Sequence, residues 1–220
     1  MKKENQKNFY YAVGLLLSFV LWTVLICFVD VKAIGPRGSV VGFATLNQFV
    51  HKFTGVNMLL YNITDWLGLV PIGFAMGFAL FGLIQWIQRK RLLRVDYSIF
   101  ALGGFYILVM VAYILFEFVV INYRPTLING YLEASYPSST TMLVMTVMPT
   151  AIMQFNSRII NNVNRKCLSL SITAFIIFMV VGRLISGVHW ISDIIGGALL
   201  SSGLVMTYHF VISIKQKHLL

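Results

Sequence analysis

Charged residues are scarce in this 220-residue sequence. Asp, Glu, Lys and Arg make up 11% of it, whereas apolar residues make up 58%. Soluble domains carry about 25% charged and about 45–50% apolar residues. A water-soluble core cannot enclose so much apolar surface, so the membrane is predicted to be the solvent for most of the chain.

Acidic residues and cysteines are both few. The sequence has seven Asp and Glu and 17 Lys and Arg, which gives a formal net charge of +10. In a soluble protein this surplus would indicate nucleic-acid binding. Here membrane topology explains it, and we predict no nucleic-acid partner. Cys27 and Cys167 lie far apart in the sequence and form no CxxC motif, which excludes a disulfide framework.

Long apolar runs are plentiful. A bilayer core takes about 20 apolar residues per helix, and six segments approach that length. They are residues 9–29, 66–88, 98–121, 140–155, 167–188 and 191–214. We therefore predict an all-α, polytopic fold with six transmembrane helices, forming a single membrane domain over residues 1–220.

The basic residues predict the orientation. Alternate loops hold 12 of the 17 Lys and Arg, and such loops usually face the cytoplasm. Both termini of this multi-pass cell-membrane protein are thus predicted to be cytoplasmic. The other face carries residues 30–65, residues 122–139 and the turn at 187–190. Because residues 30–65 mix apolar and polar types at uneven helical spacing, we expect one or two interfacial helices there.

Three polar stretches fall on the predicted extracytoplasmic face: "NYRPTLING", "SYPSSTTM" and "GRLISGVHWISD". Ionisable groups at a membrane are costly and are functional candidates. His189 and Asp193 are four residues apart, so on one helix they would share a face. The carboxylate would then bind one ring nitrogen and leave the other as a nucleophile or base. The alternative is a simple His–Asp pair at a helix start.

The other polar residues suit an anion. Ser138 or Ser139 can begin a helix, and the free N–H groups there either bind an anion or are merely capped. Arg124 and Arg183 carry donor forks that match phosphate oxygens, although lone arginines often extend to lipid headgroups instead. Their convergence with His189 on one face favours a phosphate pocket that contains a nucleophile.

This combination resembles the type 2 phosphatidate phosphatase and acid haloperoxidase superfamily, whose signature is K-x6-R-P, P-S-G-H and S-R-x5-H-x3-D. Arg183, His189 and Asp193 match the third part in type and spacing, with Gly182 in place of the leading Ser. The three parts occur in order within residues 117–193.

The first part of the signature is only half matched. Arg124 and Pro125 are present, but Glu117 occupies the Lys position. Glu117 is seven residues from Arg124, so the two side chains can pair on a helix. Alternatively, burial would raise the pKa of the Glu117 carboxyl and let it act as an acid.

The second part is also altered. Pro137 and Ser138 match, whereas Ser139 and Thr140 replace Gly and His. In the family that His protonates the leaving group, which Thr140 cannot do near neutral pH. General acid catalysis contributes about 10²–10⁴-fold, and most for poor leaving groups. The loss therefore favours a diphosphate substrate, because its leaving group is a stable phosphate anion.

The resemblance implies that His189 is a nucleophile that forms a phosphohistidine and that Asp193 orients it. The implied phosphate ligands are Arg124, Arg183, Ser138 and the backbone N–H groups near Ser139. No metal or other cofactor is implied. The expected partners are membrane lipids and a lipid phosphate or diphosphate substrate, such as the bacterial undecaprenyl carrier.

Two other functions stay open at this stage. A non-catalytic family member would keep the pocket to bind a phospholipid or polyprenyl phosphate, and the changes at Glu117 and Thr140 fit that alternative. The presence of His189 and Asp193 favours an enzyme, because a binder needs no oriented imidazole. A small unrelated transporter has less support, since transporter sites lie near the middle of the membrane.

Overall fold

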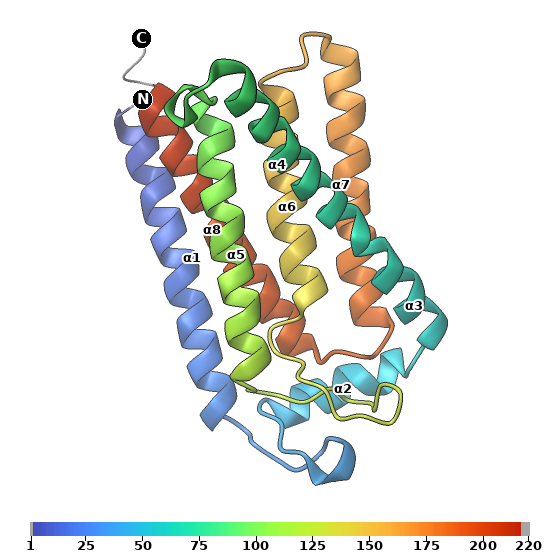
Figure 1. The fold of residues 1–220 in the computed structure, drawn as a ribbon. Coiled ribbons are helices and arrows are strands. Elements are labelled where there is room, and N and C mark those ends of the chain that lie inside the picture. The colour runs from blue at the N-terminus through green and yellow to red at the C-terminus, as the bar shows by residue number, and fades with distance from the viewer. Residues whose placement is uncertain (1, 217–220) are drawn as a thin grey trace.

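The computed structural model describes residues 2–216, and every named element in that range is a helix (Figure 1). The elements are α1 (Lys2–Phe28), η1 (Pro36–Gly38), α2 (Ala44–Thr54), α3 (Met58–Leu67), α4 (Leu69–Arg89), η2 (Leu92–Arg94), α5 (Tyr97–Phe118), α6 (Ser139–Asn156), α7 (Asn162–Ile185) and α8 (Ile191–Gln216). The all-α prediction is confirmed for the described residues.

The six expected apolar segments correspond to α1, α4, α5, α6, α7 and α8, but residues 66–88 begin in α3, and residues 98–121 and 167–188 extend past α5 and α7. Five helical stretches among the described residues are long and apolar enough to cross a membrane, which makes the chain a multi-pass membrane protein. They are Gln6–Phe28, Met58–Arg89, Tyr97–Phe118, Asn162–Ile185 and Ile191–Lys215.

Helix α6 is not among these five stretches. It packs against four other helices, α4, α5, α7 and α8 (Figure 1). Nine of its residues are buried, and its sequence includes four threonines. The hydroxyl groups of Thr146 and Thr150 donate to carbonyl groups one turn earlier in the helix, at 2.7 and 3.0 Å. These two hydroxyl groups are thus satisfied within the helix, so α6 need not be as apolar as helices that face lipid.

The segment between α1 and α4 differs from expectation in part. It forms two helices, α2 and α3, but α3 continues through Gly68 into α4 as one apolar stretch, Met58–Arg89. Helix α2 lies across one end of the bundle, next to the loop between α5 and α6 (Figure 1). An interfacial position for α2 remains a prediction.

The two ends of the bundle differ in composition. Helix α1 begins and α8 ends at one end, where the α4–α5 and α6–α7 connections also lie (Figure 1). Basic residues lie at this end, among them Arg89 at the end of α4, Arg94 in η2 and Arg158 between α6 and α7. The opposite end gathers α2, the α5–α6 loop and the α7–α8 turn, where all three polar stretches meet. That this end faces away from the cytoplasm remains a prediction.

Candidate functional site

The turn between α7 and α8 holds His189 in a rigid position. Gly187 in that turn has φ +66°, and a Cβ there would overlap the carbonyl oxygen of Gly55. Only glycine permits both this conformation and this close approach. The Asn57 N–H donates to the Ser186 carbonyl at 2.9 Å. The segment between α2 and α3 therefore sets the position of the turn.

His189 is 3% exposed, and its Nδ1 faces Ser135. Nδ1 lies 3.1 Å from Ser135 Oγ and 3.2 Å from the Ser135 carbonyl oxygen. The expected pairing with Asp193 is present only as a 3.9 Å contact between Nδ1 and Oδ2. His189 precedes α8, which begins at Ile191, so the two side chains do not share one helical face. The Ser135 hydroxyl, which donates to Asp193 Oδ2, bridges the gap.

Asp193 is fully buried among hydrogen-bond donors. Its Oδ2 also accepts from the Trp190 N–H at 2.9 Å, and its Oδ1 accepts from Asn122 Nδ2 at 3.3 Å. The Ser192 hydroxyl lies 3.5 Å from the same Oδ1. A buried carboxylate needs such partners, because an unsatisfied charge inside a protein is costly. The carboxylate is thus held in one orientation beside Ser135.

Helix α2 supports this arrangement through Asn47. The Asn47 side chain donates to Ser192 Oγ at 2.9 Å and accepts from the Ser192 N–H at 3.2 Å. Sequence reasoning missed Asn47, Asn122 and Ser135. Asn122 and Ser135 are the first residues of two of the polar stretches that it singled out, but Asn47 is 145 residues from Ser192 and carries no local signal.

The other ring nitrogen of His189 faces Arg124. The distance from Nε2 to Arg124 Nη1 is 3.4 Å. Burial, with a further contribution from the Arg124 charge, lowers the pKa of His189 to about 4. The imidazole is therefore neutral at pH 7.

A cavity of about 270 Å³ opens beside His189. Its lining combines one cation, Arg124, with the carboxylates of Glu117 and Glu133. Arg124 forms an ion pair with Glu133, 3.1 Å from Nε to Oε2, rather than with Glu117. Among the described residues, no group of three His, Cys, Asp or Glu side chains is placed to hold a metal ion.

The start of α6 lies at the cavity. Ser138 is the N-cap, and its hydroxyl accepts from the Thr141 N–H at 3.4 Å. Ser138 is fully buried and does not line the cavity, whereas Ser139 does. The N–H groups of the first turn have no acceptor within the helix. Those of Ser139 and Thr140 are therefore available to an anion.

Arg183 lies apart from this cavity. It is 1% exposed and donates to Thr64 Oγ1 at 3.3 Å and to Asp65 Oδ1 at 3.2 Å. Its guanidinium carbon also lies 4.8 Å from the ring centroid of Tyr61. The guanidinium carbon of Arg124 lies 5.9 Å from the same centroid. Helix α3 thus engages the two Nη groups of Arg183, whereas its buried Nε has no hydrogen-bond partner among the described residues. Arg124 and His189 meet as expected, but Arg183 does not join them.

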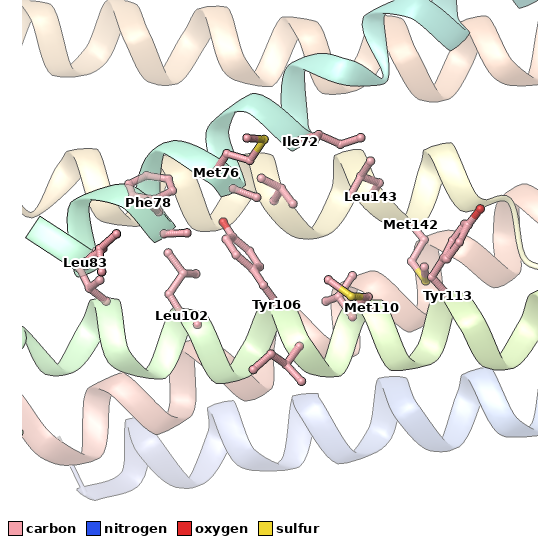
Figure 2. Close-up of a pocket in the computed structure, with 18 of the residues that line it drawn as sticks. Ile72, Met76, Phe78, Leu83, Leu102, Tyr106, Met110, Tyr113, Met142 and Leu143 are labelled. Atoms are coloured by element: carbon pink, nitrogen blue, oxygen red, sulfur yellow. The ribbon is translucent and has the colours of Figure 1, made fainter. Parts of the chain in front are cut away.

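A larger apolar groove of about 980 Å³ runs between α4, α5 and α6. In Figure 2, Ile72 and Met76 of α4 face Met110 of α5 and Leu143 of α6 across it. Along α5 its lining extends from Ile99 to Tyr113, about 21 Å at 1.5 Å per residue.

The groove and the cavity meet. Tyr113, Ser139 and Met142 line both of them. Thr140 lines the groove and not the cavity. A polar, cation-containing cavity therefore opens at one end of an apolar groove that is lined mainly by α4, α5 and α6.

A family model described as the PAP2 superfamily matches residues 100–217, more than half of the chain and including Arg124, His189 and Asp193. The chain belongs to the PAP2 superfamily. Among solved structures, this PAP2 protein is similar to the first transmembrane PAP2-type phosphatidylglycerolphosphate phosphatase from Bacillus subtilis. The TM-score is 0.55 at 17% identity, covering 94% of this chain and 97% of that one, which shows a shared fold. No curated protein matches the chain.

Proposed function

We propose that this PAP2 protein is a membrane lipid phosphatase that works through a phosphohistidine at His189. The observation that carries the proposal is the position of His189 Nε2, 3.4 Å from Arg124, in a cavity that opens into an apolar groove. The groove suits a hydrocarbon chain and the cavity suits a phosphate. The fold shared with a PAP2-type phosphatase supports the same function.

In the first step, the Nε2 lone pair attacks phosphorus, and the bond from phosphorus to the leaving lipid oxygen breaks. Arg124 and the first-turn N–H groups of α6 hold the non-bridging oxygens, where preorganised donors stabilise the developing charge. The proton on Nδ1 stays in place. In the second step, water attacks phosphorus, the bond to Nε2 breaks, and inorganic phosphate leaves.

The leaving group decides the substrate class. Thr140, at the position of the family's acid, lines the groove where the departing lipid would lie. A threonine hydroxyl does not protonate a leaving alkoxide near pH 7, and the missing acid is worth about 10²–10⁴-fold. A lipid diphosphate avoids that loss, because the lipid monophosphate departs as a stable anion. We therefore favour a polyprenyl diphosphate over a phosphatidate-type monoester.

The distribution of basic residues supports one orientation of the site in the membrane. The end opposite His189 carries Arg89, Arg94 and Arg158. The positive-inside rule favours a cytoplasmic position for that end. The site would then act on lipid phosphates presented at the extracytoplasmic face.

The test is phosphate release by the protein purified in detergent, with undecaprenyl diphosphate and phosphatidic acid as substrates. His189→Ala is expected to abolish release, whereas His209→Ala, on α8 outside the cavity, is the matched control and should leave it unchanged. Brief incubation with labelled diphosphate should give an acid-labile, base-stable phosphoprotein that His189→Ala lacks. Release that survives His189→Ala would contradict the proposal.

A second candidate is a non-catalytic binder of phospholipid or polyprenyl phosphate. It is favoured by one observation, the ion pair of Arg124 with Glu133, together with the engagement of Arg183 by α3. Both contacts reduce the positive charge offered to a phosphate. Absence of release from either lipid, with saturable binding retained, would support this candidate.

A further inference from the structure

We infer that Ser135 is a positioning residue that transmits the charge of Asp193 to His189 and fixes which ring nitrogen carries the proton. The inference rests on the proposed function for its kinetic consequences. Its geometric basis is independent of that function. Ser135 Oγ lies 3.1 Å from His189 Nδ1 and also donates to Asp193 Oδ2.

The distances exclude a direct bond in this structure. His189 Nδ1 and Asp193 Oδ2 are 3.9 Å apart, beyond the range of about 2.7–3.2 Å for an N–H···O hydrogen bond. The carboxylate therefore reaches the imidazole only through the Ser135 hydroxyl. The carboxylate oxygens of Asp193 also accept hydrogen bonds from other donors, among them the Trp190 N–H at 2.9 Å.

Counting protons assigns the tautomer. A serine hydroxyl has one proton, and here that proton goes to the carboxylate. Ser135 Oγ can then only accept from Nδ1. The Ser135 carbonyl oxygen, 3.2 Å from Nδ1, is likewise only an acceptor. Both neighbours require the proton on Nδ1, which leaves the lone pair on Nε2 facing Arg124 and the cavity.

The backbone keeps Ser135 in this position. Its N–H donates to the Asn122 carbonyl at 2.9 Å, next to a bridge between Tyr123 and Ala134. Ser135 is 2% exposed. The following residue, Tyr136, is 1% exposed and bonds to Thr23 through its hydroxyl. The loop is thus anchored on both sides of the serine.

The Ser135 hydroxyl between His189 and Asp193 matters most when the Nε2–phosphorus bond forms. At that moment the ring gains positive charge while Nδ1 keeps its proton. The hydroxyl, polarised by Asp193, stabilises that charge more strongly than in the resting state. Interactions that strengthen in the transition state raise kcat, whereas those equal in both states alter KM. Loss of the Ser135 hydroxyl should therefore lower kcat and leave KM unchanged.

The experiment compares Ser135→Ala and Ser135→Thr with Ser201→Ala. Ser201 is also fully buried with one hydrogen bond, to the Met142 carbonyl at 3.2 Å, but it lies outside the cavity lining. Ser135→Ala should lower kcat about ten- to a hundredfold. Ser135→Thr, which keeps the oxygen, should restore most of the rate, and Ser201→Ala should retain wild-type kcat.

A second measurement separates this inference from the proposed function. ¹⁵N NMR of histidine-labelled protein reports the tautomer of His189 even if no substrate is turned over. The expected result is an Nδ1–H form in the wild type and a tautomer mixture in Ser135→Ala. An Nε2–H form in the wild type, or an unchanged tautomer and unchanged kcat in Ser135→Ala, would overturn the inference. Catalytic inactivity of the wild type would overturn the proposed phosphatase function and leave the inference about the tautomer intact.

Discussion

Glu133 holds the guanidinium group of Arg124 through an ion pair, with 3.1 Å between Glu133 Oε2 and Arg124 Nε. Both residues line the cavity beside His189. A phosphate that binds Arg124 must compete with this carboxylate. The cavity is therefore less cationic than the matched signature implies, and Glu133 becomes a determinant of phosphate affinity.

Neutralising Glu133 should strengthen phosphate binding. The pair is partly exposed, with 41% of the Glu133 side chain accessible, so its worth is about 0–1 kcal/mol. Glu133→Gln should accordingly lower the inhibition constant for inorganic phosphate or vanadate by up to about fivefold. Asp30→Asn removes one negative charge near the same end of the bundle but outside the cavity. If Asp30→Asn strengthens phosphate binding as much as Glu133→Gln does, the gain comes from the net charge of the protein and not from the ion pair with Arg124.

The buried imidazole predicts an unusual pH dependence. The pKa of His189 is lowered to about 4, whereas an unfolded His has about 6.5. His189 should stay neutral and reactive down to about pH 4. Between these values the unfolded chain binds more protons, so stability should fall as the pH falls. An NMR titration, with the signal assigned by its absence in His189→Asn, checks this, and a midpoint near 6.5 would refute it.

Filling the groove should impair lipid substrates selectively. A Cβ at Gly103 or at Gly104 meets no atom within 4 Å, but only Gly103 lines the groove. Gly103→Leu should displace about two methylene groups of a bound chain and raise KM for a long-chain lipid about tenfold. Gly104→Leu is the matched control and should have little effect. Hydrolysis of a short, water-soluble diphosphate should be unchanged in both variants.

Restoring an acid at the start of α6 should widen the substrate range. Thr140→His places an imidazole where a leaving lipid would lie and should raise hydrolysis of phosphatidic acid about tenfold or more. Thr140→Ala should behave like the wild type, because the threonine donates no proton. Rates on both lipids are measured side by side. No gain on the monoester would count against the leaving-group argument.

The support from α2 should be visible in stability. Asn47 is fully buried and bonds to Ser192 and to the Gly42 carbonyl, the latter at 2.7 Å. Asn47→Ala leaves buried groups unpaired, at a cost of about 1–3 kcal/mol. Thermal denaturation in detergent should show a lower Tm together with reduced activity. The exposed Asn62, changed to Ala, should alter stability by less than about 0.5 kcal/mol.

Sequence reasoning succeeded where the controlling interaction is local or one-dimensional. Apolar runs predict the membrane helices because each run must satisfy its own backbone in lipid. The start of α6 is predicted correctly because its N-cap, Ser138, binds a partner only three residues away, the N–H of Thr141. It did not predict the contact of Arg183 with Asp65, which lies 118 residues earlier on α3. No spacing pattern reports a contact over that separation.

The amino-acid sequence by itself determined the membrane class, the helical fold and the three polar stretches that meet at one end of the bundle. Hydropathy and residue type suffice for these, because a backbone in lipid must satisfy its own hydrogen bonds, which an α-helix does. Only the tertiary structure decided that Ser135 bridges His189 and Asp193, that Glu133 pairs with Arg124, and that Arg183 turns to α3. Such partners are chosen by packing, since several donors and acceptors compete within a few ångströms once the helices have assembled.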